Sequence, residues 1–171
     1  MNRTRILSFI VVFLLLLVVF LIVSASVSLM TITLGIIASA VVAFFTSTLV
    51  VKEHPGKAFN LARWAWAIAY FFYYFLIAEL KCHWDVIKRI LNPRMPIKPG
   101  IVRVPYYVKS DYAIAAVACS ITNTPGTVVV DIDETKKSYY VHWIDVKDVE
   151  DSKCYDAISK SFEKYIRGVF D

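Results

Sequence analysis

The sequence predicts a membrane α-helical N-terminal half with three transmembrane helices, followed by a small α+β domain of order β-α-β-β-α. Long uncharged apolar stretches are confined to residues 1–80, whereas shorter segments with strand-like and helical spacing follow residue 100. The balance of basic and acidic residues also differs between these parts of the chain. Residues 1–80 hold five basic and two acidic side chains, residues 81–109 seven and one, and residues 110–171 seven and eleven. We therefore expect transmembrane helices over 1–91, a proline-containing connector with the first strand over 92–109, and the rest of the domain over 110–171.

The first predicted span covers residues 6–23, which are eighteen residues without a charge. A helix needs roughly 20 such residues to cross about 30 Å of hydrocarbon. A cleaved signal peptide is the alternative, and Arg3, Arg5 and the small residues 24–26 favour it. Signal cores are usually about 7–15 residues long, and a second apolar segment follows directly. We therefore expect this helix to be retained.

The second predicted span covers residues 31–51, and the short linker over 24–30 favours an antiparallel pair of helices. This span carries a group of small residues that would let another helix approach closely: Gly35, Ala38, Ser39, Ala40 and Ala43. Either a partner helix or lipid fits that face. A polar turn over 52–57 then reverses the chain, because Pro55 and Gly56 interrupt the helix.

The third predicted span covers residues 61–80, is rich in Trp, Tyr and Phe, and continues as an amphipathic helix to about residue 91. Aromatic residues near Arg63 are typical of a headgroup-level belt. A helix lying in the membrane interface is the alternative, because Arg63 is costly in hydrocarbon. Charge does not decide: three spans divide the basic residues evenly between the two sides, whereas two spans place them all inside.

The remaining segments predict the small domain. Prolines 96, 99 and 105 favour an extended connector. We expect a strand over 100–108, a helix from Ser110 or Asp111 to about Ile121, a tight turn over 124–127, a hairpin of strands 127–133 and 138–146, and a final helix starting near Asp151 or Ser152. About 70 such residues fold only marginally alone and gain stability from docking.

The sequence lacks the motifs that carry enzyme chemistry. It contains no GxxxxGK[ST], HExxH or CxxC pattern, and Cys82, Cys119 and Cys154 are odd in number and far apart. We therefore expect no catalytic residues, no metal and no cofactor. Nucleic acid is not an expected partner, because the basic excess follows apolar spans directly and suits anionic lipid headgroups.

Four ionisable residues near the end of the third span are the best candidates for proton handling, namely Glu79, Lys81, His83 and Asp85. They also fall at the predicted membrane boundary, where charged side chains are cheap and where Glu79 and His83 form an i, i+4 pair. A structural or interfacial role is therefore the stronger interpretation. We interpret His142 as a surface or packing residue on a strand, and Asp131 and Asp133 as part of a solvated strand face.

The second half carries a recognisable pattern. It consists of Asn-Pro-Arg-Met-Pro-Ile-Lys-Pro-Gly-Ile (92–101), Lys-Ser-Asp (109–111), Thr-Pro-Gly-Thr (124–127), Asp131, and Tyr-Val-His-Trp-Ile-Asp-Val (140–146). This pattern resembles the E-type subunit of the Mrp (Mnh) multisubunit sodium/proton antiporters. The Thr124, Pro125, Gly126, Thr127 turn is its clearest marker. A structural role is expected there, because Pro125 presets φ and Gly126 permits a positive φ.

The resemblance implies an accessory, non-catalytic membrane subunit partnered by large antiporter-like subunits, with the ion path in those partners. Homologues also occur in archaeal membrane-bound hydrogenases, so the host is either a plain antiporter or a redox-driven complex. The resemblance further implies a plasma-membrane location with a cytoplasmic C-terminal domain. The alternative function is a stand-alone membrane-anchored module whose domain recruits a soluble partner.

Overall fold

The computed structural model describes the backbone of residues 3–50 and 60–171. The predicted polar turn over 52–57 lies outside the described residues. Three helices are long and apolar enough to cross a membrane, namely Arg5–Ser24, Leu29–Ser47 and Leu61–Ile90, and a three-stranded sheet with helices follows them. The predicted fold class is confirmed to the extent of three apolar helices long enough to cross a membrane and a small α+β domain after them. The chain divides into two compact units, Met1–Asn60 and Leu61–Asp171, and the predicted domain limits at 91 and 109 stay predictions.

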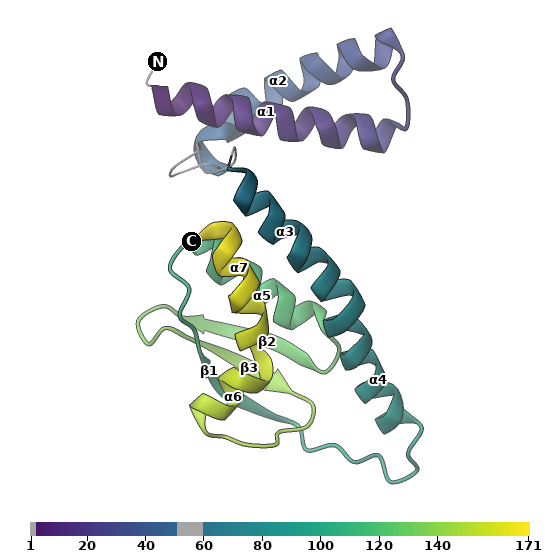
Figure 1. The fold of residues 1–171 in the computed structure, drawn as a ribbon, viewed down its shortest axis with the longest axis vertical. Helices are drawn as coiled ribbons and strands as arrows, with labels where there is room; N and C mark the ends of the chain where they lie inside the picture. Colours follow the sequence, from purple (N-terminus) through teal and green to yellow (C-terminus); the bar gives the residue numbers. More distant parts are fainter. Residues whose placement is uncertain (1–2, 51–59) are drawn as a thin grey trace. The chain divides into compact units, whose positions relative to one another are not determined.

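The first unit is an antiparallel hairpin of α1 (Arg3–Ser24) and α2 (Leu29–Val50), shown in Figure 1. Its turn includes Ala25 at φ 48°. Small and polar side chains fill the contact between the helices, because Ser8, Val12, Ser39, Ala43 and Ser47 are buried there. Part of the small-residue face of α2 therefore packs on α1 within the same chain.

The second unit begins with one continuous helix made of α3 (Leu61–Tyr73), the π-helical turn η2 (Tyr74–Ala78) and α4 (Glu79–Ile90). The turn is a π-helix because the backbone N–H of Glu79 donates to the carbonyl of Tyr74, five residues earlier. Such insertions change which side chains share a face. Here Tyr74 and Ala78 are both buried against the domain.

The domain follows as β1 (Gly100–Pro105), α5 (Asp111–Asn123), β2 (Thr127–Asp133), β3 (Ser138–Trp143), α6 (Asp151–Ile158) and α7 (Lys160–Phe170). The sheet order is β1-β3-β2 with both pairs antiparallel. Ser110 caps α5 by accepting the N–H of Ala113 at 3.3 Å. The predicted single final helix is observed as two helices, α6 and α7, that meet at Ser159. The N–H of Ser159 donates to the carbonyl of Tyr155, and the N–H of Glu163 donates to the carbonyl of Ser159, so backbone hydrogen bonding continues across the bend.

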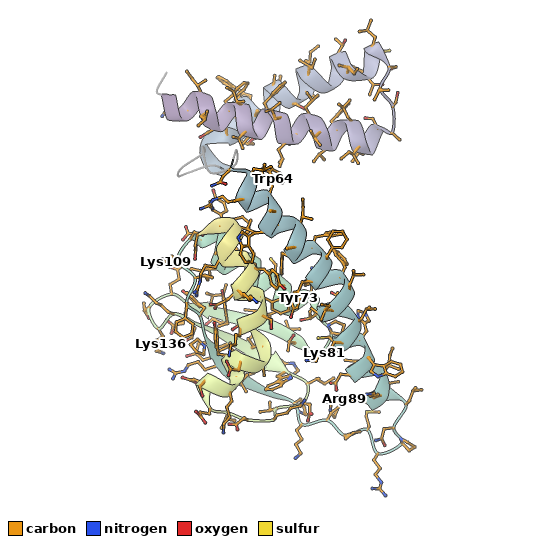
Figure 2. All side chains as sticks on the ribbon, viewed as in Figure 1. Trp64, Tyr73, Lys81, Arg89, Lys109 and Lys136 are labelled. Carbon is orange, nitrogen blue, oxygen red and sulfur yellow. The ribbon has the colours of Figure 1, made fainter. Side chains whose placement is uncertain are left out.

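One face of the sheet carries the helices. Strand pairing aligns Val102, Val141 and Val129 in a row on the core side, whereas the next row, with Ile101 and Val128, is exposed. The core between the sheet and the helices also takes side chains from η2, α5, α6 and α7. The long helix thus contributes to the domain core, and the side chains in Figure 2 show this packing along α3 and α7.

Candidate functional site

The face of α3, η2 and α4 that packs on the domain is called the helix–domain seam. Aromatic rings dominate its middle: the ring of Tyr165 on α7 lies 4.7 Å from that of Tyr73 and 6.1 Å from those of Trp66 and Tyr70. The hydroxyl of Tyr70 forms a hydrogen bond with the hydroxyl of Ser120 on α5. The seam therefore combines apolar ring contacts with a hydrogen bond that aligns the long helix with α5.

The start of the seam is held by an arginine that binds the end of a helix. Arg63 Nη1 donates to the carbonyl of Val169 at 2.6 Å, in the last turn of α7. A guanidinium there satisfies a carbonyl that the helix leaves unpaired. Gly168 beside it allows close contact, because an added Cβ would lie 2.6 Å from the indole of Trp66.

Two of the four predicted proton-handling residues lie together at η2. Tyr74 donates its hydroxyl to Glu79 Oε1 at 2.7 Å, and His83 Nδ1 lies 3.0 Å from the other carboxylate oxygen and 2.9 Å from the Glu79 carbonyl. The side chain of Glu79 is 18% exposed and that of His83 is 58% exposed. The ring of Tyr74 lies 6.1 Å from that of Phe162 and 5.9 Å from that of Tyr70. The hydrogen bond from Tyr74 thus holds the Glu79 carboxylate at the π-turn, beside the domain core.

The other two predicted residues lie apart from this cluster. Asp85 pairs with Arg89 at 2.9 Å, and Arg89 also reaches Asp145 at 2.9 Å and the carbonyl of Pro96 at 2.7 Å. Arg89 therefore connects α4, the connector and the segment after β3. Among the described residues, Lys81 makes no ion pair within 4.0 Å. The sequence did not single out Tyr74, Arg89 or Asp145, because their partners are distant or on the far side of an irregular turn.

The Thr124–Thr127 turn is built by its hydroxyls. Thr124 Oγ1 and Thr127 Oγ1 donate to the carbonyl of Ile121 at 2.8 and 2.7 Å, which closes the last turn of α5. Gly126 has φ +97°, and the N–H of Ile144 donates to its carbonyl at 2.9 Å. An added Cβ on Gly126 would lie 3.7 Å from Val86 Cγ2 on α4. The turn therefore joins α5, β2 and β3 where the domain meets the long helix.

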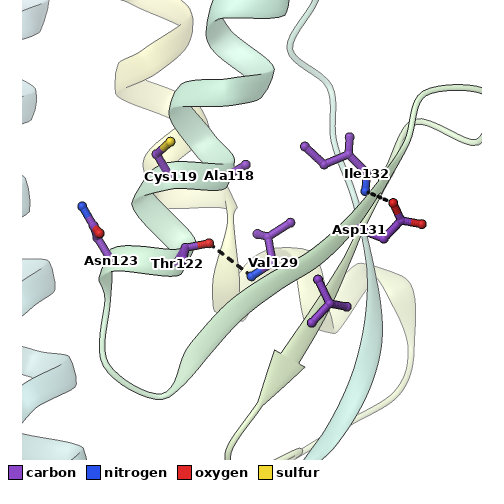
Figure 3. Close-up of a pocket in the computed structure, with 8 residues that line it drawn as sticks. Ala118, Cys119, Thr122, Asn123, Val129, Asp131 and Ile132 are labelled. Carbon is purple, nitrogen blue, oxygen red and sulfur yellow. Dashed lines mark hydrogen bonds between the residues drawn. The ribbon is translucent and has the colours of Figure 1, made fainter.

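A shallow groove lies between the end of α5 and the edge strand β2 (Figure 3). It is lined by Ala118, Cys119, Thr122, Asn123, Val129, Val130, Asp131 and Ile132. Two polar side chains in it already serve the backbone, since Thr122 accepts the N–H of Val129 at 3.2 Å and Asp131 that of Ile132 at 2.9 Å. Among the described residues, no ion pair joins the side chains that line the groove.

Asp133, at the end of β2, is held by hydrogen bonds within the hairpin turn. Asp133 Oδ1 accepts from the Thr135 hydroxyl at 2.6 Å and from two backbone N–H groups of the hairpin turn, and these bonds lower the pKa of Asp133 to about 2. A bulge between Val129 and Asp131 interrupts this strand. His142 is exposed on β3. Within 3–50 and 60–171, no three His, Cys, Asp or Glu side chains are grouped to hold a metal ion.

The domain core contains one carboxylate, Glu163, which is 1% exposed. Its two oxygens accept the N–H of Tyr107 at 3.2 Å each, and Arg167 Nη2 lies 3.5 Å from Oε2. Burial raises the pKa of Glu163, although the Tyr107 N–H and Arg167 oppose the shift. Glu163 is not among the residues predicted from the sequence. The available signal was its spacing of three residues from Ile166, which places a charge on the buried stripe of α7.

Known proteins are similar to this chain over both its helical half and its α+β domain. A family model described as Na+/H+ ion antiporter subunit (MNHE) matches residues 13–169. The E1 subunit of a Na+/H+ antiporter from Staphylococcus epidermidis is 33% identical over 152 residues, which is 89% of this chain and 91% of that one. The E-type antiporter subunits from Alkalihalophilus pseudofirmus and Bacillus subtilis are 39% identical over 101 residues and 38% identical over 85 residues, which are 59% and 50% of this chain. These two matches span 63% and 52% of the relatives' own lengths.

A solved structure has the same fold. It is a chain of the membrane-bound sulfane sulfur reductase, an archaeal respiratory membrane complex, with a TM-score of 0.85 and 34% identity. The match covers 95% of this chain and 99% of that one. The likeness therefore includes the apolar helices as well as the α+β domain.

Proposed function

Because the chain belongs to the MNHE family of Na+/H+ ion antiporter subunits, we propose that it is an accessory, non-catalytic membrane subunit of a multisubunit cation/proton antiporter module. Its role is to support the assembly and the ion transport of that module. The family and the three apolar helices agree in making it a membrane protein. The other membrane subunits of the complex are its partners.

The observation that carries the proposal is the likeness, over 95% of the chain, to one chain of a respiratory membrane complex. A stand-alone binding module would need only its domain to be similar, but here the helices and the domain match together. The same likeness favours a second candidate host, in which redox chemistry drives the ion transport.

A non-catalytic role is supported by the contacts of the ionisable residues. Glu79 and His83 order a π-turn, Asp85 and Arg89 tie the long helix to the domain, and Glu163 binds a backbone N–H in the core. Each group therefore already has a structural task. The ion path belongs to the partner subunits in this proposal.

A cytoplasmic domain and a plasma-membrane location complete the proposal. The positive-inside rule counts Lys and Arg near the ends of the spans. Residues 81–109 carry seven basic side chains and one acidic side chain directly after the long helix. This excess supports a cytoplasmic side for the connector and the domain.

Deletion of the chain from its host complex tests the proposal. We expect less assembled complex on a native gel and a matching loss of Na+-dependent proton exchange in everted membrane vesicles, with both restored by re-expression. The purified chain in liposomes should carry no ion flux.

Re-expression of Lys147→Gln, a change at an exposed loop residue, provides the matched control and should restore both readouts. Normal assembly and exchange without the chain would reject an accessory role. Flux through the purified chain would reject the non-catalytic part.

A further inference from the structure

The long helix α3–η2–α4 has two different faces along its whole length. One face is the helix–domain seam. The opposite face carries exposed apolar side chains, namely Leu61, Trp64, Ile68, Phe71, Phe72, Phe75, Leu76, Leu80, Trp84 and Ile87. Within the unit Leu61–Asp171 these side chains stay exposed at the surface. A continuous exposed apolar surface of this kind marks a contact with a membrane or a protein.

The seam runs almost from one end of the helix to the other. The first contact is that of Arg63 with Val169, the middle ones include Tyr70 with Ser120, and the last is Arg89 with Asp145. At a rise of 1.5 Å per residue, Arg63 and Arg89 are about 39 Å apart along the axis. This length exceeds the hydrocarbon thickness of about 30 Å.

A spanning helix would therefore take the domain into the bilayer beside it. Residues 110–171 hold seven basic and eleven acidic side chains, and charges in hydrocarbon are expensive. The exposed edge strands of the sheet would also leave backbone groups without partners in lipid. The packing of the domain on the helix is thus compatible with water on one side of the helix and apolar surroundings on the other.

We propose that α3–η2–α4 lies along the surface of an anionic membrane, with its exposed apolar face in the headgroup and upper acyl region and the domain on the water side. Helices that lie in the interface have an apolar face with Trp, Phe and Leu and basic residues beside it. Trp64, Phe72 and Trp84 supply the first feature, and exposed Lys81 and Lys88 the second. The helix qualifies as a span by length and composition alone; its contacts with the domain assign it to the surface.

The distribution of charge is an independent argument for the same arrangement. With α1 and α2 as the only two crossings, every Lys and Arg of residues 1–109 falls on one side, since the linker over 24–30 has none. That is the asymmetry that the positive-inside rule describes. The same side would carry the anionic lipid headgroups that Lys81, Lys88 and Lys98 attract.

Sidedness of labelling tests the proposal in the full chain. Leu61→Cys and Leu91→Cys mark the two ends of the helix in a variant in which Cys82, Cys119 and Cys154 are replaced by Ala, and Val149→Cys marks the domain. In vesicles, a membrane-impermeant maleimide should label all three thiols from the same side. Labelling of Leu61→Cys and Leu91→Cys from opposite sides would overturn the proposal.

The depth of spin labels in the bilayer distinguishes a lipid contact from a contact with a protein partner. This measurement also tests the proposal if lipid shields the Leu61→Cys thiol from the maleimide. Spin labels at Ile68→Cys, Phe72→Cys and Trp84→Cys in phosphatidylglycerol vesicles should lie at one shallow depth, as judged by collisions with oxygen and with a water-soluble nickel complex. A maximum of depth at Phe72→Cys would indicate a span. Full water exposure at all three positions in vesicles, lost only in the assembled complex, would assign the face to a partner subunit. Either result overturns the proposal.

Discussion

Glu163 is a carboxylate held inside the domain core, and its environment predicts how stability depends on pH. Burial raises the pKa of Glu163, so the folded chain binds this proton more tightly than the unfolded chain. The stabilisation is complete below the unfolded pKa and is lost as pH rises through the folded pKa. Glu163→Gln stays neutral at every pH. We therefore expect the thermal midpoint of the variant to rise relative to that of the native chain as pH increases above the ordinary pKa of a glutamate, about 4.

Glu134→Gln is the control for this prediction, because Glu134 is an exposed carboxylate in the hairpin turn. The difference between the midpoints of Glu134→Gln and the native chain should stay constant over the same range of pH. A constant difference for Glu163→Gln as well would contradict the assignment of the pH dependence to the core carboxylate.

Gly126 allows a prediction about backbone conformation that is separate from packing. An added Cβ would lie 3.1 Å from Ile144 Cγ2 at Gly126 and 3.1 Å from Val146 Cγ2 at Gly100, but only Gly126 has a positive φ, +97°. The left-handed region costs other residues about 1–2 kcal/mol. We expect Gly126→Ala to lower the free energy of unfolding by roughly that amount more than Gly100→Ala does, as measured by denaturant titration. Equal losses would show that crowding alone matters.

Single residues were predictable from the sequence where their role is local. The positive φ expected at Gly126 and the cap expected at Ser110 are both observed, because each depends on residues three or four positions away. The hydroxyl bonds of Thr124 and Thr127 to one carbonyl, and the burial of Glu163, were not predicted. They depend on neighbours that the fold brings together.

At the scale of elements, Arg89 connects three of them and should matter more than an exposed ion pair does. The side chains of Arg89 and Asp145 are 12% and 19% exposed, whereas those of Arg103 and Asp151, which pair between β1 and α6, are 48% and 38% exposed. Arg89→Gln leaves Asp145 partly buried without its cation, and we expect a loss of about 2–3 kcal/mol in the free energy of unfolding. Arg103→Gln should cost clearly less, because water screens an exposed ion pair.

Chemical denaturation of the full chain in detergent, followed by circular dichroism, compares the two variants directly. Faster amide hydrogen exchange in residues 97–98 and 144–146 of Arg89→Gln would show that the loss is located around Arg89 and Asp145, since the Lys98 and Asp145 segments pair there. Similar losses for both variants would mean that burial does not distinguish these two ion pairs.

The order of elements was predictable because each has its own period or boundary signal. The strands and α5 are bounded by Pro, Gly, Ser and Thr, and the predicted β-α-β-β-α order is confirmed. The break between α6 and α7 at Ser159 was not predicted, because the apolar stripe continues through it. The π-turn at Tyr74–Ala78 was also missed, since Phe, Tyr and Leu fill that segment on every side and hide the change of face.

At the scale of the whole molecule, the sequence predicted three apolar helices long enough to span a membrane, and these are observed. It did not predict that one side of the third helix packs on the domain. Length and hydropathy describe a helix in isolation, and by those measures residues 61–90 resemble a span. The contacts with α5 and α7 that occupy one side of it join residues 50 to 106 positions apart. Contacts between residues so far apart in the sequence produce no periodic pattern of apolar residues from which they could be predicted.

The ionisable cluster at η2 distinguishes an accessory role from a place on a proton path. Glu79 accepts from Tyr74, whose ring packs on that of Phe162, and lies beside exposed His83. We therefore expect Glu79→Gln to leave Na+-dependent proton exchange, per assembled complex, within about twofold of the native value, whereas loss of an intramembrane proton carrier abolishes transport. Lys147→Gln, a change at an exposed loop residue of the domain, is the control. Exchange that disappears in Glu79→Gln while the amount of assembled complex is normal would place Glu79 on the proton path and remove the structural interpretation of the cluster.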